Sequence, residues 1–202
     1  TYDETYSHNP FPYWKESRWD FVVEGIRELA KVAEDSGIVL AMQNHGPDVI
    51  TTYQEVLQMI EEVGSPAFKG CMDINIEPDP VCETVEHARK MARDSGPLQI
   101  HSHCNGEFAR AESGRVELAA SGYFDARFWE RRVAYPAYVE ALVDAGYDGY
   151  INWEFCHPAK TDGAFEGIEY VHNQTQLAHE YLNHLRANAL AKKAQGAVAG
   201  SR

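Results

Sequence analysis

Short apolar segments alternate with amphipathic segments along most of this chain, and this alternation restricts its fold more than any other feature. Four apolar segments have the length and character of buried strands: Ile38–Met42, Phe68–Met72, the segment that begins at Leu98, and Tyr150–Trp153. Segments with helical spacing of apolar residues lie between and around them. Strands that alternate with helices through short connections predict a parallel sheet covered by helices, so we expect an α/β fold.

The predicted helices have recognisable ends. The first covers about Trp19–Asp35, and its apolar positions at helical spacing are Val22, Ile26, Leu29 and Ala33. Thr52 and Glu55 have the spacing of a capping box, and Gly64 follows where that helix should end. Later helices are predicted to begin at Asp79-Pro80, to cover about 136–145, and to cover about 168–185, while Asn105–Tyr123 is expected to be a long polar connection.

Polar side chains follow every predicted strand at its carboxyl end. They are Gln43, Asp73, the alternating pair His101 and His103, and Glu154. Each residue alone is typical of a helix cap or a hydrogen-bonded core residue. Because the carboxyl ends of parallel strands lie on one side of a sheet, the four ends can meet. An amide oxygen, two carboxylates and an imidazole suit one divalent ion, with Mn²⁺ favoured and Mg²⁺, Co²⁺ or Zn²⁺ as alternatives.

Composition excludes several classes of protein. The 202 residues carry a net charge of −13 without a cluster of Lys and Arg, so nucleic acid is not an expected partner. No apolar run reaches the roughly 18–20 residues of a membrane helix, and the first residues do not resemble a secretion signal. The four cysteines are widely spaced, which indicates neither a disulfide framework nor a structural zinc site. We therefore expect a cytoplasmic protein without membrane partners.

Four segments together resemble a known family, the TIM-barrel sugar isomerases and epimerases of the xylose-isomerase-like type. The segments are LAMQNH at 40–45, CMDIN at 71–75, HSHCNGEFAR at 101–110 and INWE at 151–154. The resemblance covers about Trp19–Leu185 and implies that the chain supplies strands five to eight of a (β/α)₈ barrel with their helices. The QNH sequence at 43–45 is also similar to enzymes of this scaffold that deglycosylate 3-oxo-glycosides, including C-glycosides.

The resemblance also implies roles for individual residues. In the family these strand ends supply glutamate, aspartate, histidine and glutamate to one divalent metal, and they correspond here to Gln43, Asp73, His103 and Glu154. Residues implied or expected to contact a carbohydrate or keto-sugar substrate are Arg110, Glu107, Asn75 and His8. The family often has a substrate-binding histidine three residues after the aspartate, whereas this chain has Ile76.

Gln43 changes the chemistry that we expect. Many members of the family have a glutamate there, which works with the last glutamate as a paired acid and base, but an amide cannot take a proton at neutral pH. Proton transfer would then depend on Glu154 and a histidine, with His45, His101 and His8 as candidates in that order. Such an asymmetric site favours elimination or deglycosylation next to a carbonyl. The alternatives are a sugar or sugar phosphate isomerase or epimerase, and a non-catalytic half-barrel subunit.

The predicted organisation has three parts. Residues 1–18 form a loop that leads into the barrel, residues 19–187 form its second half, and residues 188–202 form a flexible tail. Four strands cannot close an eight-stranded barrel of about 250 residues, and its outer strands would have unpaired edges. We therefore expect an oligomer or a partner chain that completes the barrel.

Overall fold

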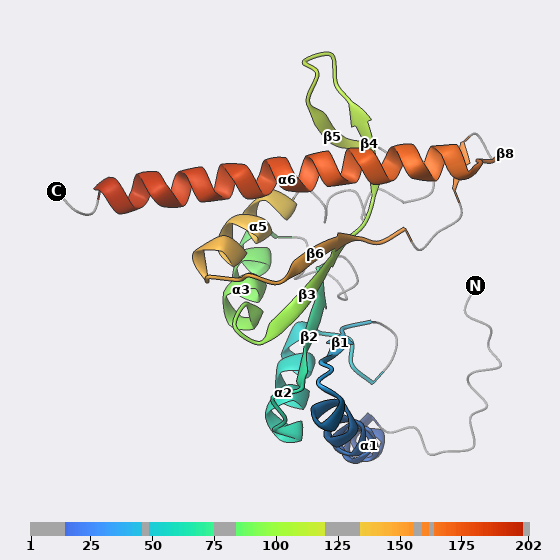
Figure 1. The fold of residues 1–202 in the computed structure, drawn as a ribbon, viewed down its shortest axis with the longest axis vertical. Coiled ribbons are helices and arrows are strands. Elements are labelled where there is room, and N and C mark those ends of the chain that lie inside the picture. Colours follow the sequence, from blue (N-terminus) through green and yellow to red (C-terminus); the bar gives the residue numbers. More distant parts are fainter. Residues whose placement is uncertain are drawn as a thin grey trace.

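The computed structural model describes residues 15–45, 49–74, 84–119, 134–155, 159–161 and 164–199. Its central element is a parallel sheet with the strand order β1-β2-β3-β6, and the strands are β1 (Leu40–Gln43), β2 (Phe68–Asp73), β3 (Gln99–Cys104) and β6 (Tyr150–Trp153). Figure 1 shows helices α2 (Tyr53–Val63), α3 (Val85–Ser95) and α5 (Tyr135–Asp144) along one side of this sheet. The predicted arrangement of parallel strands and covering helices is confirmed.

The core lies between β2, β3 and these helices. Phe68 and Met72 of β2 are buried toward the helices, with Val56, Met59 and Met91 among their buried neighbours in the core. Ser102 of β3 lies on the same side, where its hydroxyl donates to the carbonyl of Met72 and lies 3.0 Å from the Tyr138 hydroxyl of α5. Because side chains alternate along a strand, the neighbours of these core residues point to the opposite face.

The strands β1 and β6 form the two edges of the sheet within the described part of the chain. Ile38 and Val39 precede β1 and are exposed, Ile38 by 57%, so the prediction of a buried strand over Ile38–Met42 is wrong at its start. Tyr150 at the start of β6 is 74% exposed. An apolar, β-branched sequence favours a strand. Its residues are fully buried only where other elements cover them, and an edge strand has a neighbouring strand on one side only.

Helix α1 (Lys15–Ser36) begins before the predicted Trp19 and packs on α2 with a slightly different face from the one predicted. Its buried residues are Val23, Ile26, Ala30 and Ala33, whereas Leu29 is 60% exposed. The apolar positions of α1 fit two adjacent faces, and contact with α2 selects one of them. The α2 helix has the predicted capping box at Thr52 and Glu55 and ends at Gly64, which adopts φ of 68°.

Helix α3 begins at Val85, because Thr84 caps it by accepting a hydrogen bond from the His87 N–H. The predicted start at Asp79-Pro80 lies outside the described residues, and the described helix is capped at Thr84. Val85 lies in the exposed first turn, while Ala88 and Ala92 are buried as predicted.

A β-hairpin occupies part of the predicted polar connection. Its strands are β4 (Glu107–Arg110) and β5 (Val116–Ala119), and a second small pair consists of β7 (Lys160–Thr161) and β8 (Ala164–Phe165). Helix α6 (Ile168–Ala199) packs against both β4 and α5, as Figure 1 shows. The α6 helix continues past the predicted helix end near residue 185 and into the predicted tail 188–202, through an alanine-rich sequence with strong helix propensity. None of the described helices combines the length and the apolar character required to cross a membrane.

Candidate metal centre

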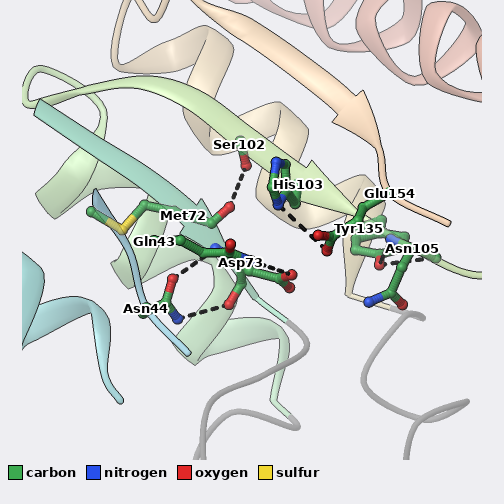
Figure 2. A network of polar contacts seen from close by, with 9 residues as sticks. All are labelled: Gln43, Asn44, Met72, Asp73, Ser102, His103, Asn105, Tyr135 and Glu154. Atoms are coloured by element: carbon green, nitrogen blue, oxygen red, sulfur yellow. Dashed lines mark hydrogen bonds and ion pairs between the residues drawn. The ribbon is translucent and has the colours of Figure 1, made fainter. Parts of the chain in front are cut away.

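The register of the central strands brings the predicted site residues to one face. Cys71 lies opposite His101, and Asp73 lies opposite His103, in the parallel pairing of β2 and β3. All four side chains alternate with the core-facing residues Met72 and Ser102, so they point away from the covering helices. Figure 2 shows Gln43, Asp73, His103 and Glu154 converging at the carboxyl ends of four strands.

Asp73 is completely buried, and its backbone is held by Asn44. The Asn44 side-chain amide donates to the carbonyl oxygen of Asp73 and accepts from its N–H, both at 2.8 Å. One side chain therefore fixes both polar groups of the Asp73 backbone and links the end of β1 to the end of β2 (Figure 2). Gln43, which precedes Asn44, places its amide nitrogen 3.5 Å from Asp73 Oδ2. A half-turn of the Gln43 amide would direct its oxygen there instead.

Glu154 follows β6 and continues the ladder, because its N–H donates to the carbonyl of Cys104 at 2.8 Å. Its Oε2 atom lies 3.4 Å from His103 Nδ1, close enough for an ion pair. Both atoms are buried, and neither makes a hydrogen bond. The neighbouring His103 lowers the pKa of Glu154, while Cys71 and Glu154 raise the pKa of His103 to about 10.

The residues present fit a divalent cation. Asp73, His103 and Glu154 each offer one ligand atom, and these atoms all lie within 4.8 Å of one another. An ion placed among them would satisfy the two buried atoms that lack hydrogen bonds, and two carboxylates would balance its charge. Two oxygens and one imidazole suit Mn²⁺ or Mg²⁺ and also accommodate Zn²⁺. The structure thus brings together three of the four predicted ligands, with Gln43 beside them.

Two further candidates for proton transfer lie near this group. The His101 ring packs edge-on against His103, with 5.1 Å between ring centroids, and burial lowers the pKa of His101. His45 follows β1 with an exposed side chain, and its proximity contributes to the lowered pKa of Glu154.

The predicted substrate contacts lie in different places. Arg110 is on the hairpin, where its exposed guanidinium binds Glu180 of α6 through two hydrogen bonds of 2.9 and 2.7 Å. Glu107 is buried at the start of β4. Burial of Tyr170, followed by the nearby charge of Glu107, raises the pKa of Tyr170 to about 12. His8 and Asn75 lie outside the described residues.

Sequence reasoning overlooked the residues that position this site. Asn44 is one of them, and Tyr135 is another, because its hydroxyl accepts from the Asn105 N–H at 2.8 Å and donates to the Asn105 carbonyl at 3.1 Å. Tyr135 therefore holds the chain just after the histidine strand. The available signal was a polar residue placed directly after a strand, but its partner is a backbone group, which no side-chain pattern reveals.

Comparison with known proteins identifies the fold to which this site belongs. The family described as xylose isomerase-like TIM barrel matches residues 6–186. Among curated proteins, D-psicose 3-epimerase from Ruminiclostridium cellulolyticum is 29% identical over 159 residues, which are 74% of this chain and 46% of that protein. The chain thus spans about half the length of this relative.

Solved structures share the fold at lower identity. The structure of D-psicose 3-epimerase from Clostridium cellulolyticum H10 with D-tagatose is 23% identical, with a TM-score of 0.53. The match covers 92% of this chain and 58% of the epimerase chain. L-ribulose 3-epimerase is 16% identical with a TM-score of 0.60 and coverages of 88% and 57%. The 3-keto-D-glucoside 4-epimerase of E. coli is 17% identical with a TM-score of 0.52 and coverages of 86% and 56%.

These comparisons confirm the family and the fold predicted from the four strand-end segments, while the assignment to barrel strands five to eight stays a prediction. The open parallel sheet with its helices is part of a TIM barrel architecture. Because the family match extends over most of the sequence, this chain belongs to the xylose isomerase-like TIM barrel family.

Proposed function

We propose that this chain holds a divalent metal for sugar isomerase or epimerase chemistry, in which a proton moves at a carbon next to a carbonyl. The observation that carries the proposal is the convergence of Asp73, His103 and Glu154, whose buried Nδ1 and Oε2 atoms have no hydrogen bond. Support for the reaction class comes from the curated relative, which is a 3-epimerase. This relative favours the isomerase or epimerase alternative over the elimination that the asymmetric site suggested.

The chain's own residues would divide the work. The metal ligands would be Asp73, His103 and Glu154, with Gln43 as a fourth through its amide oxygen, and the bound ion would polarise the substrate carbonyl. Glu154 is the carboxylate that can take a proton from the neighbouring carbon, because Gln43 has no ionisable group. Asn44 would keep Asp73 in place through the two bonds to its backbone.

The replacement of a second carboxylate by Gln43 distinguishes two reactions within this class. Transfer of a proton between adjacent carbons on one face needs a single group, which Glu154 can be. Epimerisation needs a proton on the opposite face of the same carbon, so it requires a second group. His101, whose ring packs against His103, and His45 near Glu154 are the candidates for that role.

The test compares metal content and proton exchange in four proteins. Wild type, Asp73→Asn, Glu154→Gln and the exposed control Glu112→Gln are dialysed against Mn²⁺, analysed for metal, and incubated in D₂O with ketoses such as D-psicose, D-fructose and L-ribulose. We expect about one metal per chain and deuterium uptake in wild type and the control, loss of metal in Asp73→Asn, and no deuterium uptake in Glu154→Gln. Equal metal content in wild type and Asp73→Asn would refute the proposed centre.

The same experiment separates catalysis from simple binding. If the protein holds metal but exchanges no substrate proton, the non-catalytic half-barrel subunit becomes the better reading. The exposed residues Ile38, Val39 and Tyr150 beside the two sheet edges support a partner chain or second copy at these edges. Light scattering measures that association directly, and a stable monomer would contradict it.

A further inference from the structure

A second group of potential ligands lies on the same face of the sheet, and the proposed function does not use it as a group. Cys71, His101 and His103 each offer one ligand atom, and these atoms lie within 4.8 Å of one another. Cys71 is 5% exposed and forms no disulfide. It lies directly opposite His101 in the pairing of β2 and β3, so the sheet itself sets this distance.

The donor set is chemically different from that of the neighbouring group. A thiolate and two imidazoles are ligands that Zn²⁺, Co²⁺ and Cu⁺ bind strongly, whereas Mg²⁺ and Mn²⁺ prefer carboxylate oxygens. Tetrahedral zinc with bond lengths of about 2.0–2.3 Å places its ligand atoms roughly 3.3–3.7 Å apart. Because the three atoms lie within 4.8 Å of one another, displacements of at most about 1–1.5 Å by side-chain rotation would bring them into that geometry.

His103 belongs to both groups, and its chemistry makes them compete. A neutral imidazole has one lone pair, because its other ring nitrogen carries the proton. His103 Nδ1 lies 3.4 Å from Glu154 Oε2, so an Nδ1–H can be directed at that carboxylate while Nε2 carries the lone pair. A carboxylate that orients the far nitrogen of a metal-binding histidine is the common outer-shell arrangement of zinc sites.

We propose that Cys71, His101 and His103 form a second cation site, selective for zinc-class ions, that competes for His103 with the oxygen-rich site of Asp73 and Glu154. An ion at the thiolate site takes the His103 lone pair and leaves the oxygen-rich site with two carboxylates only. Zinc-class ions would therefore displace a harder ion such as Mn²⁺. This inference depends on ligand geometry and not on the proposed reaction.

Cobalt(II) is the probe, because a thiolate ligand gives it an intense near-ultraviolet charge-transfer band that oxygen and nitrogen ligands do not give. The protein is titrated with Co²⁺ alone, followed by absorbance, as wild type, Asp73→Asn, Cys71→Ser and the control Cys104→Ser. Cys104 is the matched control because, like Cys71, it is a buried cysteine that forms no disulfide, and it lies on the neighbouring strand β3. We expect the band in wild type, Asp73→Asn and Cys104→Ser, and its loss in Cys71→Ser.

A band that persists in Cys71→Ser, or cobalt that binds wild type without the band, would overturn the proposal. If Cys71→Ser does not fold, as far-ultraviolet circular dichroism would show, His101→Gln replaces it, because His101 is only partly buried and its loss should also weaken cobalt binding. Competition is measured separately by electron paramagnetic resonance of Mn²⁺-loaded protein. Release of Mn²⁺ at lower Zn²⁺ concentrations in wild type than in Cys71→Ser supports the shared His103, whereas simultaneous binding of both ions to wild type refutes it.

Discussion

Replacement of Asn44 by alanine tests the argument that an uncharged side chain holds the metal centre in position. Asn44 is fully buried, and its two bonds of 2.8 Å satisfy the N–H and the carbonyl of Asp73. Without them, two buried backbone groups lose their partners, and each unpaired group costs about 1–3 kcal/mol. Partial entry of water offsets some of this cost, so we expect a loss of about 2–4 kcal/mol in the free energy of unfolding.

The loss should appear in two assays. Urea unfolding of metal-stripped protein gives the stability, and Mn²⁺ titration gives the affinity, which should fall about 10- to 100-fold because Asp73 is no longer fixed. The matched control is Asn183→Ala, since Asn183 also donates to a backbone carbonyl, that of His179, but on the exposed surface of α6. If both variants lose the same small stability and Asn44→Ala keeps its metal affinity, the positioning role of Asn44 is refuted.

Three further predictions test packing, ionisation and anchoring of the hairpin. Gly149→Ala would place a Cβ 2.5 Å from a carbonyl oxygen of β3, so thermal unfolding should show a loss of stability of about 1–3 kcal/mol. Its control is Gly25→Ala in α1, whose added Cβ meets no atom within 4 Å and should stabilise the protein by about 0.5–1 kcal/mol. Burial raises the pKa of Tyr138 above its ordinary 10.0, so its folded state favours the neutral phenol; stability should fall as pH rises above 10, and less so in Tyr138→Phe, as denaturant midpoints across that range would show. Arg110→Ala removes the ion pair with α6 and should speed amide hydrogen exchange in β4 and β5, while unchanged exchange there would show that other contacts anchor the hairpin.

The convergence of the candidate site residues could be predicted from the sequence, because one strand periodicity and one topological rule determine it. Side chains alternate in a strand, so His101 and His103 had to share a face, and parallel strands place their carboxyl ends together, so Asp73, His103 and Glu154 could meet. Each of these inferences depends on local pattern plus one topological rule. The identity of the family followed from the same residues.

Features that depend on a particular neighbour were not predictable in this way. Leu29 and Ala30 are both apolar, and only the position of α2 determines which of them is buried. Ile38 has the character of a core residue but lies beside an edge strand. The partner of Arg110 is 70 residues away on α6, and no spacing in the sequence connects the two.

Asn44 and Tyr135 share one pattern: a single side chain accepts from the N–H and donates to the carbonyl of the same residue. Gln174 of α6 does the same for Phe108 of β4, with bonds of 2.8 and 3.1 Å. Because these clamps engage only the main chain of the residues they hold, they place no demand on the side chains at those positions. The backbone path at these three positions is therefore fixed separately from the side chains that they carry.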